Sequence, residues 1–286
     1  MSVRASFSLG KALSAAFGFL PKAWGGAWLA LILLAALGTG SHLAGMALHC
    51  HHLHHLIHFV ALILLLVLHF MAMGALYRIA LFGKDARKEG LGFGGLQFAK
   101  PELRLIGATI VVNLFILVIV ATLGIVFAML FNLLGFGAGY DNTSKALCAM
   151  LARHSTPADY AVMVYIALSL IFLVFLVLKF SLFHAATVAE RKMVTLNALG
   201  LSSGHAGKLF IGFVTLFVPF ALIGMILLHI FAAHIRTAHL LPHVWGTYEL
   251  HLVLHGLMHL LLVAVFLPLC AGFLASAYRQ IVDTRG

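Results

Sequence analysis

Six long apolar segments constrain this chain more than any other feature of its sequence. They run over Ala23–Leu48, Leu56–Gly83, Leu103–Phe136, Tyr160–Ala186, Leu209–His234 and His251–Gln280. Each is long enough to cross the hydrocarbon core of a bilayer, which takes about 20 helical residues, and none has Asp or Glu in its central part. Only 9% of the residues are charged, against roughly 25% in soluble domains. The sequence predicts an all-α polytopic membrane protein, a single transmembrane domain with about six helices.

The basic residues predict how this domain lies in the membrane. One set of connections carries most of the lysines and arginines, whereas the opposite set holds only Lys145, Arg153 and Arg236. Cytoplasmic loops are the ones enriched in Lys and Arg, so both termini are expected in the cytoplasm, as an even number of helices also requires. The net charge of +10 is then a matter of topology, and no nucleic-acid partner is indicated.

The chain also contains an internal repeat, with units at approximately 7–90, 91–193 and 194–286. Each unit begins with a glycine-containing, weakly amphipathic lead-in: Phe7–Lys22, Leu91–Leu105 and Leu196–Phe210. A helix, an outer loop and a returning helix follow. The returning helices end alike, in Ala75-Leu76-Tyr77-Arg78, Thr187-Val188-Ala189-Glu190-Arg191 and Ala277-Tyr278-Arg279-Gln280. We expect three pseudo-repeated hairpins packed with threefold pseudosymmetry, and lead-ins that form short amphipathic helices at the inner interface.

With these hairpin repeats and Tyr-Arg endings, the chain resembles six-helix bacterial inner-membrane proteins related to the membrane domain of glycerophosphoryl diester phosphodiesterases. The resemblance covers most of the chain and implies a multi-pass protein of the bacterial cytoplasmic membrane. The phosphodiesterase catalytic domain is missing, so its activity is not implied. The histidines described next are not part of the resemblance.

Most of the 18 histidines fall at the predicted extracytoplasmic side, in or beside the outer loops. At about 100° per residue, His51, His54, His55 and His58 share one face of the second helix, and His69 returns to that face deeper in the membrane. On the sixth helix, His251, His255 and His259 follow one another at i, i+4 and i+8. His229 and His234, near the outer end of the fifth helix, complete the candidate set. Two imidazole stripes are therefore predicted on helices from different repeats.

Imidazole stripes of this kind predict a transition-metal site. Imidazole is a common ligand for Zn, Cu, Ni and Fe, and the lack of carboxylates argues against Mg, Ca and Mn. Polar groups within a bilayer are costly and usually functional. We therefore expect Cu or Zn, with Fe as a further choice, and Met46, Met71, Met73 and Met258 as additional ligands for Cu(I). The implied partners are metal ions, a periplasmic metal carrier or a larger membrane complex, besides the lipid bilayer.

Three alternatives remain open from the residues alone. A b-type haem needs two histidines on facing helices, and His69 with His259 or His229 would serve. A di-iron oxygenase is suggested by the box His51-His52-Leu53-His54-His55 together with the His-x-x-x-His pairs of the sixth helix. It is the least favoured, because there is one such box and it lies on the side opposite to the one where such enzymes work. A non-catalytic scaffold or accessory subunit would instead use the histidines as a pH-responsive surface. Hydrolytic chemistry is disfavoured, because intramembrane acids for a Ser-His-Asp arrangement are lacking, and a binding protein is favoured over an enzyme.

Overall fold

The computed structural model describes residues 7–47, 51–134, 156–238, 254 and 256–284, and within these ranges all regular structure is helical. The helices are α1 (Leu9–Ala47), α2 (His51–Phe82), α3 (Lys100–Leu133), α5 (Pro157–Phe180), α6 (Phe183–Ala189), α7 (Ala198–Leu201), α8 (Ala206–Ala238) and α10 (Leu267–Asp283). Short 3-10 turns, η1 (Gly83–Arg87) and η2 (Phe93–Gly95), join α2 to α3, and a π-helical turn, η3 (Leu262–Phe266), leads into α10.

Six stretches of the described chain are long and apolar enough to cross a membrane. They are Leu9–Gly40, Phe59–Arg87, Phe93–Leu133, Pro157–Ala189, Ala206–Leu227 and Gly256–Asp283. Each corresponds to one of the six apolar segments in the sequence. The expectation of an all-α polytopic membrane protein is thus confirmed.

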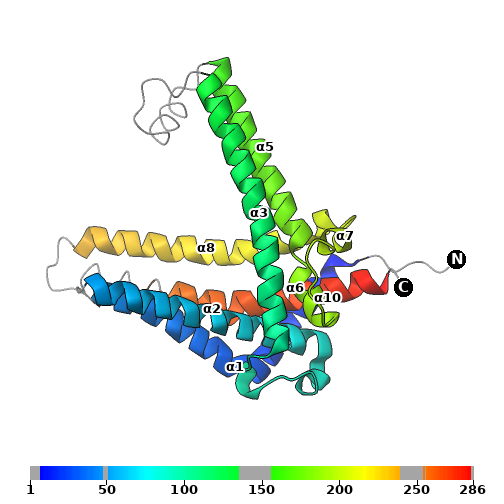
Figure 1. Cartoon of the computed structure of the whole chain (residues 1–286). Coiled ribbons are helices and arrows are strands. Elements are labelled where there is room, and N and C mark those ends of the chain that lie inside the picture. Colours follow the sequence, from blue (N-terminus) through cyan, green and yellow to red (C-terminus); the bar gives the residue numbers. More distant parts are fainter. Residues whose placement is uncertain (1–6, 48–50, 135–155, 239–253, 255, 285–286) are drawn as a thin grey trace.

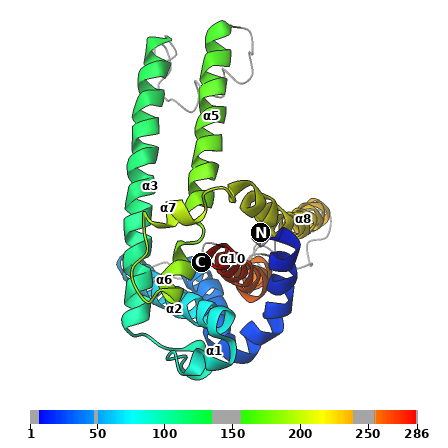
Figure 2. The same ribbon diagram turned by 90° about the vertical axis from the view of Figure 1, so that its right-hand side faces the viewer.

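The best-packed part of the molecule is a three-helix core of α1, α2 and α10 (Figures 1 and 2). Its buried surface is rich in small side chains, among them Ala12, Ala16, Ala23, Ala27, Ala30, Ala72, Ala75, Ala271, Ala275 and Ala277. Small residues let transmembrane helices approach closely, which supplies the van der Waals contact that lipid cannot. This core is built from the first and last hairpins of the repeat.

The three hairpins are not equivalent in space, in contrast to the threefold packing expected from the repeat. Figure 1 shows α3 and α5 side by side and directed away from α1, α2, α8 and α10. Both helices expose bulky apolar side chains along most of their length, such as Leu117, Val118, Leu168 and Ile171. Large side chains suit a lipid-facing helix, whereas the alanines of the core favour close helix contact. The side chains thus explain the different packing.

The lead-ins to the hairpins also differ from one another. The first is the start of α1, which Ala27 (φ −123°, ψ 18°) separates from the rest of that helix by a kink. The second contains only the turn η2 before α3 begins, and the third only the single turn α7 before α8. Helical structure is present in each, but only the first lead-in is a helix of several turns.

The two chain ends meet at one end of the core. The backbone N–H of Ser8 donates to Oε1 of Gln280 at 2.9 Å, and Nζ of Lys208 donates to the carbonyl oxygen of Phe7 at 2.7 Å. These bonds join the beginnings of α1 and α8 to the end of α10. Both termini therefore lie on the same side of the bundle, as an even number of membrane crossings requires.

Candidate functional site

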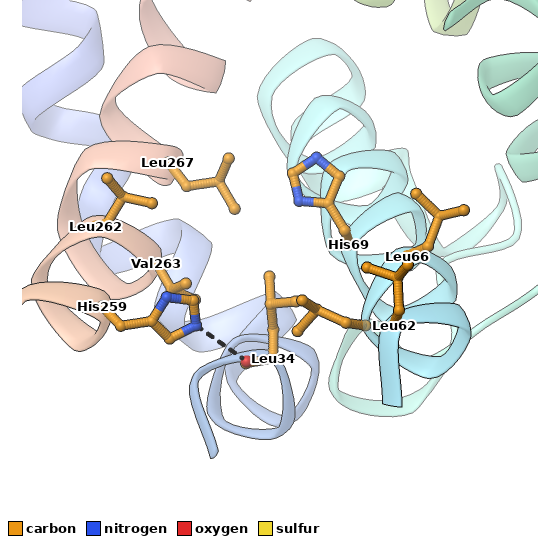
Figure 3. A pocket seen from close by; sticks show the side chains of 9 residues that line it. Leu34, Leu62, Leu66, His69, His259, Leu262, Val263 and Leu267 are labelled. Carbon is orange, nitrogen blue, oxygen red and sulfur yellow. Dashed lines mark hydrogen bonds between the residues drawn. The ribbon is translucent and has the colours of Figure 1, made fainter. Parts of the chain in front are cut away.

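One pocket of about 210 Å³ brings together histidines from the two predicted stripes. His69 projects from α2 and His259 from the helical segment 256–261, and they stand on opposite sides of the pocket (Figure 3). The remaining wall is aliphatic: Leu34, Leu62, Leu65, Leu66, Leu262, Val263 and Leu267. Among the described residues that line this pocket, only the two histidines have titratable side chains.

The position of His259 is determined by α1. Its Nε2 lies 3.5 Å from the carbonyl oxygen of Leu34 (Figure 3), at the upper limit for a hydrogen bond. The ring also lies directly over Gly38, where a Cβ atom would come within 1.9 Å of the same Nε2. Since only glycine leaves room for the imidazole at this crossing, Gly38 is required for the observed orientation of His259.

We expect Gly38→Ala to displace the His259 ring, because the added methyl group would occupy the position of its Nε2. Gly40→Ala is the matched control, since a Cβ atom there meets nothing within 4 Å. Histidine chemical shifts in selectively labelled protein provide the measurement. The His259 signals should move in the first variant and stay in place in the second. Unmoved signals in both variants would contradict the packing described.

The π-helical turn η3 positions the segment that carries His259. In a regular α-helix the carbonyl oxygen of Ala264 would accept from residue 268, but Pro268 has no N–H. The indole Nε1 of Trp24, on α1, donates to that carbonyl instead, at 2.8 Å. Insertions of this kind often mark functional sites. Here the hydrogen bond ties α1 to the helix that contributes His259 and Leu267 to the pocket.

The pocket lies on the face of α2 that carries the predicted histidine stripe. Leu62 and Leu65, at seven and four residues before His69, line it together with His69. Positions 51, 55 and 58 lie eighteen, fourteen and eleven residues before His69. At about 100° per residue around the helix axis, each of these positions points within roughly 40° of the direction in which position 69 points. Since α2 is helical from His51 onward, the backbone places these positions above the pocket along the same face.

The other candidate ligands are distributed as follows. The backbone of His54 also belongs to α2, whereas His251 and His255 lie outside the described residues. His229 is exposed on α8 and does not line the pocket, and the backbone of His234 lies in the same helix. The side chain of Met258 points toward α8, since its Cε lies 3.0 Å from a Cβ built on Gly224. Within the described chain, only His69 and His259 of the candidate set share a pocket.

Neither a complete zinc site nor a haem pocket is formed by the described residues alone. They contain no group of three or more His, Cys, Asp or Glu side chains able to hold a metal ion, whereas structural zinc sites use four ligands. The pocket of about 210 Å³ is also smaller than the roughly 300–1,000 Å³ typical of sites for larger organic ligands. A porphyrin between His69 and His259 would require the aliphatic walls to move apart.

A second polar cluster, at the other end of the core, was not predicted from the sequence. Glu102 is fully buried, and its Oε1 lies 2.6 Å from Nη2 of Arg78, itself 2% exposed. The same carboxylate accepts from Nε2 of Gln97 at 3.2 Å and from the backbone N–H of Ala99 at 2.9 Å. In the sequence, Pro101-Glu102 is typical of the first turn of a helix, which gives no sign that Glu102 pairs with a distant arginine. This cluster joins α2 to the start of α3.

His184 belongs to the packing beside this cluster. Its Nε2 lies 3.1 Å from Oγ1 of Thr109, and its ring stacks on Tyr77 at 6.0 Å between centroids. Thr109 in turn donates to the carbonyl oxygen of Leu105 at 2.8 Å. Because the His184 ring joins α6 to α2 and α3, its hydrogen bond and stacking account for a partly buried imidazole there.

No family model matches the chain, and no curated protein or solved structure matches it.

Proposed function

We propose that this chain is a bacterial inner-membrane protein that binds transition-metal ions, copper or zinc, through imidazoles at its extracytoplasmic side. The observation that carries the proposal is the shared pocket of His69 and His259, which come from two helices far apart in the sequence. Imidazoles in an apolar pocket within a membrane are costly and usually functional, and among the described residues Nε2 of His259 has only the distant carbonyl oxygen of Leu34 as an acceptor, at 3.5 Å. A metal ion bound between the two rings would take ring nitrogens as its ligands.

The ligand chemistry supports copper or zinc over harder cations. The pocket lining holds neutral imidazoles and no carboxylate, and imidazole nitrogen suits Zn and Cu, whereas Mg and Ca prefer oxygen. The stripe positions 51, 55 and 58 continue from the pocket along α2. In this proposal the ion is cargo, received from the periplasm or a metal carrier and passed along the stripe.

Uptake, storage or delivery of the ion fits the described residues better than conduction of the ion through the membrane. Below the pocket, the His184 imidazole is already engaged by Thr109 and Tyr77, so it is poorly placed to receive an ion. The charge distribution of the loops supports cytoplasmic termini. With that orientation, the histidine stripes open toward the periplasm, where a carrier protein or a larger membrane complex would be met.

Metal analysis of the purified protein tests this proposal directly. We expect bound Cu or Zn in protein prepared without a metal-affinity column, and its loss when His51, His55, His251 and His255 are together replaced by alanine. The matched control replaces four histidines outside the stripes, His42, His154, His239 and His243, and should keep its metal. Equal metal content in the two quadruple variants would contradict the proposal.

A b-type haem is the second candidate, because His69 and His259 face the same apolar pocket from two helices. Haem iron accepts two axial histidines in such a setting. Against this candidate stands the limited volume of the pocket. An absorption spectrum after expression with sufficient haem separates the two possibilities, since a Soret band that disappears in His69→Ala would favour haem over a metal ion.

A further inference from the structure

A second pocket, of about 300 Å³, lies between the first part of α1, the end of α2 and α10. Figure 2 looks onto this end of the bundle, where α1, α2 and α10 come together near the chain ends. The polar part of its lining consists of Lys22, Ser276 and Arg279. None of the residues lining it is acidic, so the pocket combines two cations with a hydroxyl group.

Both cations are available to a ligand. Lys22 and Arg279 are exposed, and among the described residues neither forms an ion pair with a carboxylate. Asp283, one turn after Arg279 on α10, makes no such pair either. Elsewhere at the same end of the molecule, Lys88, Arg191 and Lys192 each have an acidic partner. The pocket thus keeps two positive charges that nothing in the described chain neutralises.

The hydroxyl of Ser276 is oriented by a short chain of hydrogen bonds. Ser8 N–H donates to Oε1 of Gln280 at 2.9 Å, which fixes the orientation of this side-chain amide. Its Nε2 then donates to Oγ of Ser276 at 3.3 Å. Because Oγ accepts this bond, the hydroxyl hydrogen remains available to donate into the pocket. Two cations and one O–H donor therefore converge, and all three suit an anionic oxygen.

We propose that this pocket binds the phosphate group of an anionic lipid at the membrane surface. Arg presents a planar fork of N–H donors that matches phosphate oxygens, and Lys adds a point charge. Basic pockets between transmembrane helices at the membrane surface are suited to lipid phosphates. Phe19 and Ile79, which also line the pocket, provide apolar surface beside the cations. A free phosphate offers the same oxygens, so the experiment distinguishes the two sources.

Native mass spectrometry of the full chain in detergent micelles, titrated with phosphatidylglycerol, tests the proposal. We expect the double variant Lys22→Gln, Arg279→Gln to bind this lipid roughly 30-fold more weakly, since two phosphate-facing charges are lost. The control Lys84→Gln, Arg87→Gln removes the same charge from exposed residues at the same end, outside the pocket. It should change the affinity less than about twofold.

A variant that fills the pocket without changing its charge shows whether lipid binding requires the pocket itself or only a positively charged surface. Gly18 lines the pocket, and a Cβ atom there meets nothing within 4 Å. Gly18→Leu should therefore keep the helix and weaken lipid binding as the double variant does. Circular dichroism melting of each variant verifies that it folds.

Titration with inorganic phosphate identifies the source of the bound group. Loss of phosphatidylglycerol binding in the two pocket variants, without displacement by phosphate, supports the lipid. Loss of inorganic phosphate binding alone supports a phosphate site that serves a soluble ligand and overturns the lipid assignment. Unchanged binding of both ligands in the pocket variants would overturn the proposal. The metal content of these variants is expected to stay normal, so a failure of the lipid proposal can be told apart from a failure of the metal proposal.

Discussion

Replacing Glu102 with leucine is expected to destabilise the protein by about 3–5 kcal/mol, the usual effect of removing one partner from a buried ion pair. The variant would leave the Arg78 guanidinium, 2% exposed, without its carboxylate. Nη1 of Arg78 already has no hydrogen-bond partner in the described structure, so the arginine depends on Glu102 for its one ion pair. The bonds from Gln97 and Ala99 would be lost as well.

The double variant Arg78→Met, Glu102→Leu is the control for this prediction. Replacing both members of a buried pair with apolar side chains is often close to neutral, so the double variant should be more stable than Glu102→Leu alone. Unfolding in detergent micelles, followed by circular dichroism, measures the free energies for a double-mutant cycle. If the loss of stability in the double variant equals the sum of the losses in the two single variants, Arg78 and Glu102 do not act as a pair.

Replacing His69 and His259 together with alanine is expected to weaken metal binding by at least roughly 100-fold. Changes to groups that merely orient metal ligands cost about 10–100-fold, and this variant would remove two of the ligands proposed above. The reason is geometric, because these are the two imidazoles that line the pocket. Isothermal titration of metal-depleted protein with Cu or Zn gives the affinity.

A control on the same pocket changes its packing but not its ligands. Leu62→Ala with Leu262→Ala removes two lining side chains that are 63% and 54% exposed, so little stability should be lost. This variant should bind metal nearly as well as the unmodified protein. Equal affinities in both double variants would place the metal outside this pocket and restrict the proposal to the outer histidines.

The fold class follows from local properties of the sequence. Each apolar segment is long enough to span the hydrocarbon core, and in lipid a helix satisfies its own backbone hydrogen bonds. Boundaries were predicted less well, because an amphipathic lead-in such as Phe7–Lys22 can continue into the spanning helix. In α1 it does so, with only the kink at Ala27 between them.

The candidate site was predicted in part. Helical phase placed His69 on the same face of α2 as the outer histidines, and that face lines the pocket. What the pattern left undecided was whether this face meets the helix that carries His259. That contact depends on Gly38, which gives the imidazole room against α1, and on the bond from Trp24 to the carbonyl of Ala264. Neither Gly38 nor Trp24 belongs to a recognisable sequence motif.

The class of the protein and its six apolar helices can be read from the sequence alone, and so can the expectation that its histidines lie mostly on one side, since these depend on hydropathy, periodicity and charge along the chain. Which helices form the core and which polar groups meet follows from the three-dimensional packing. Helix packing in lipid depends on the shapes of facing side chains, which no single segment specifies. For that reason Arg78 paired with Glu102, and His69 came to share a pocket with His259.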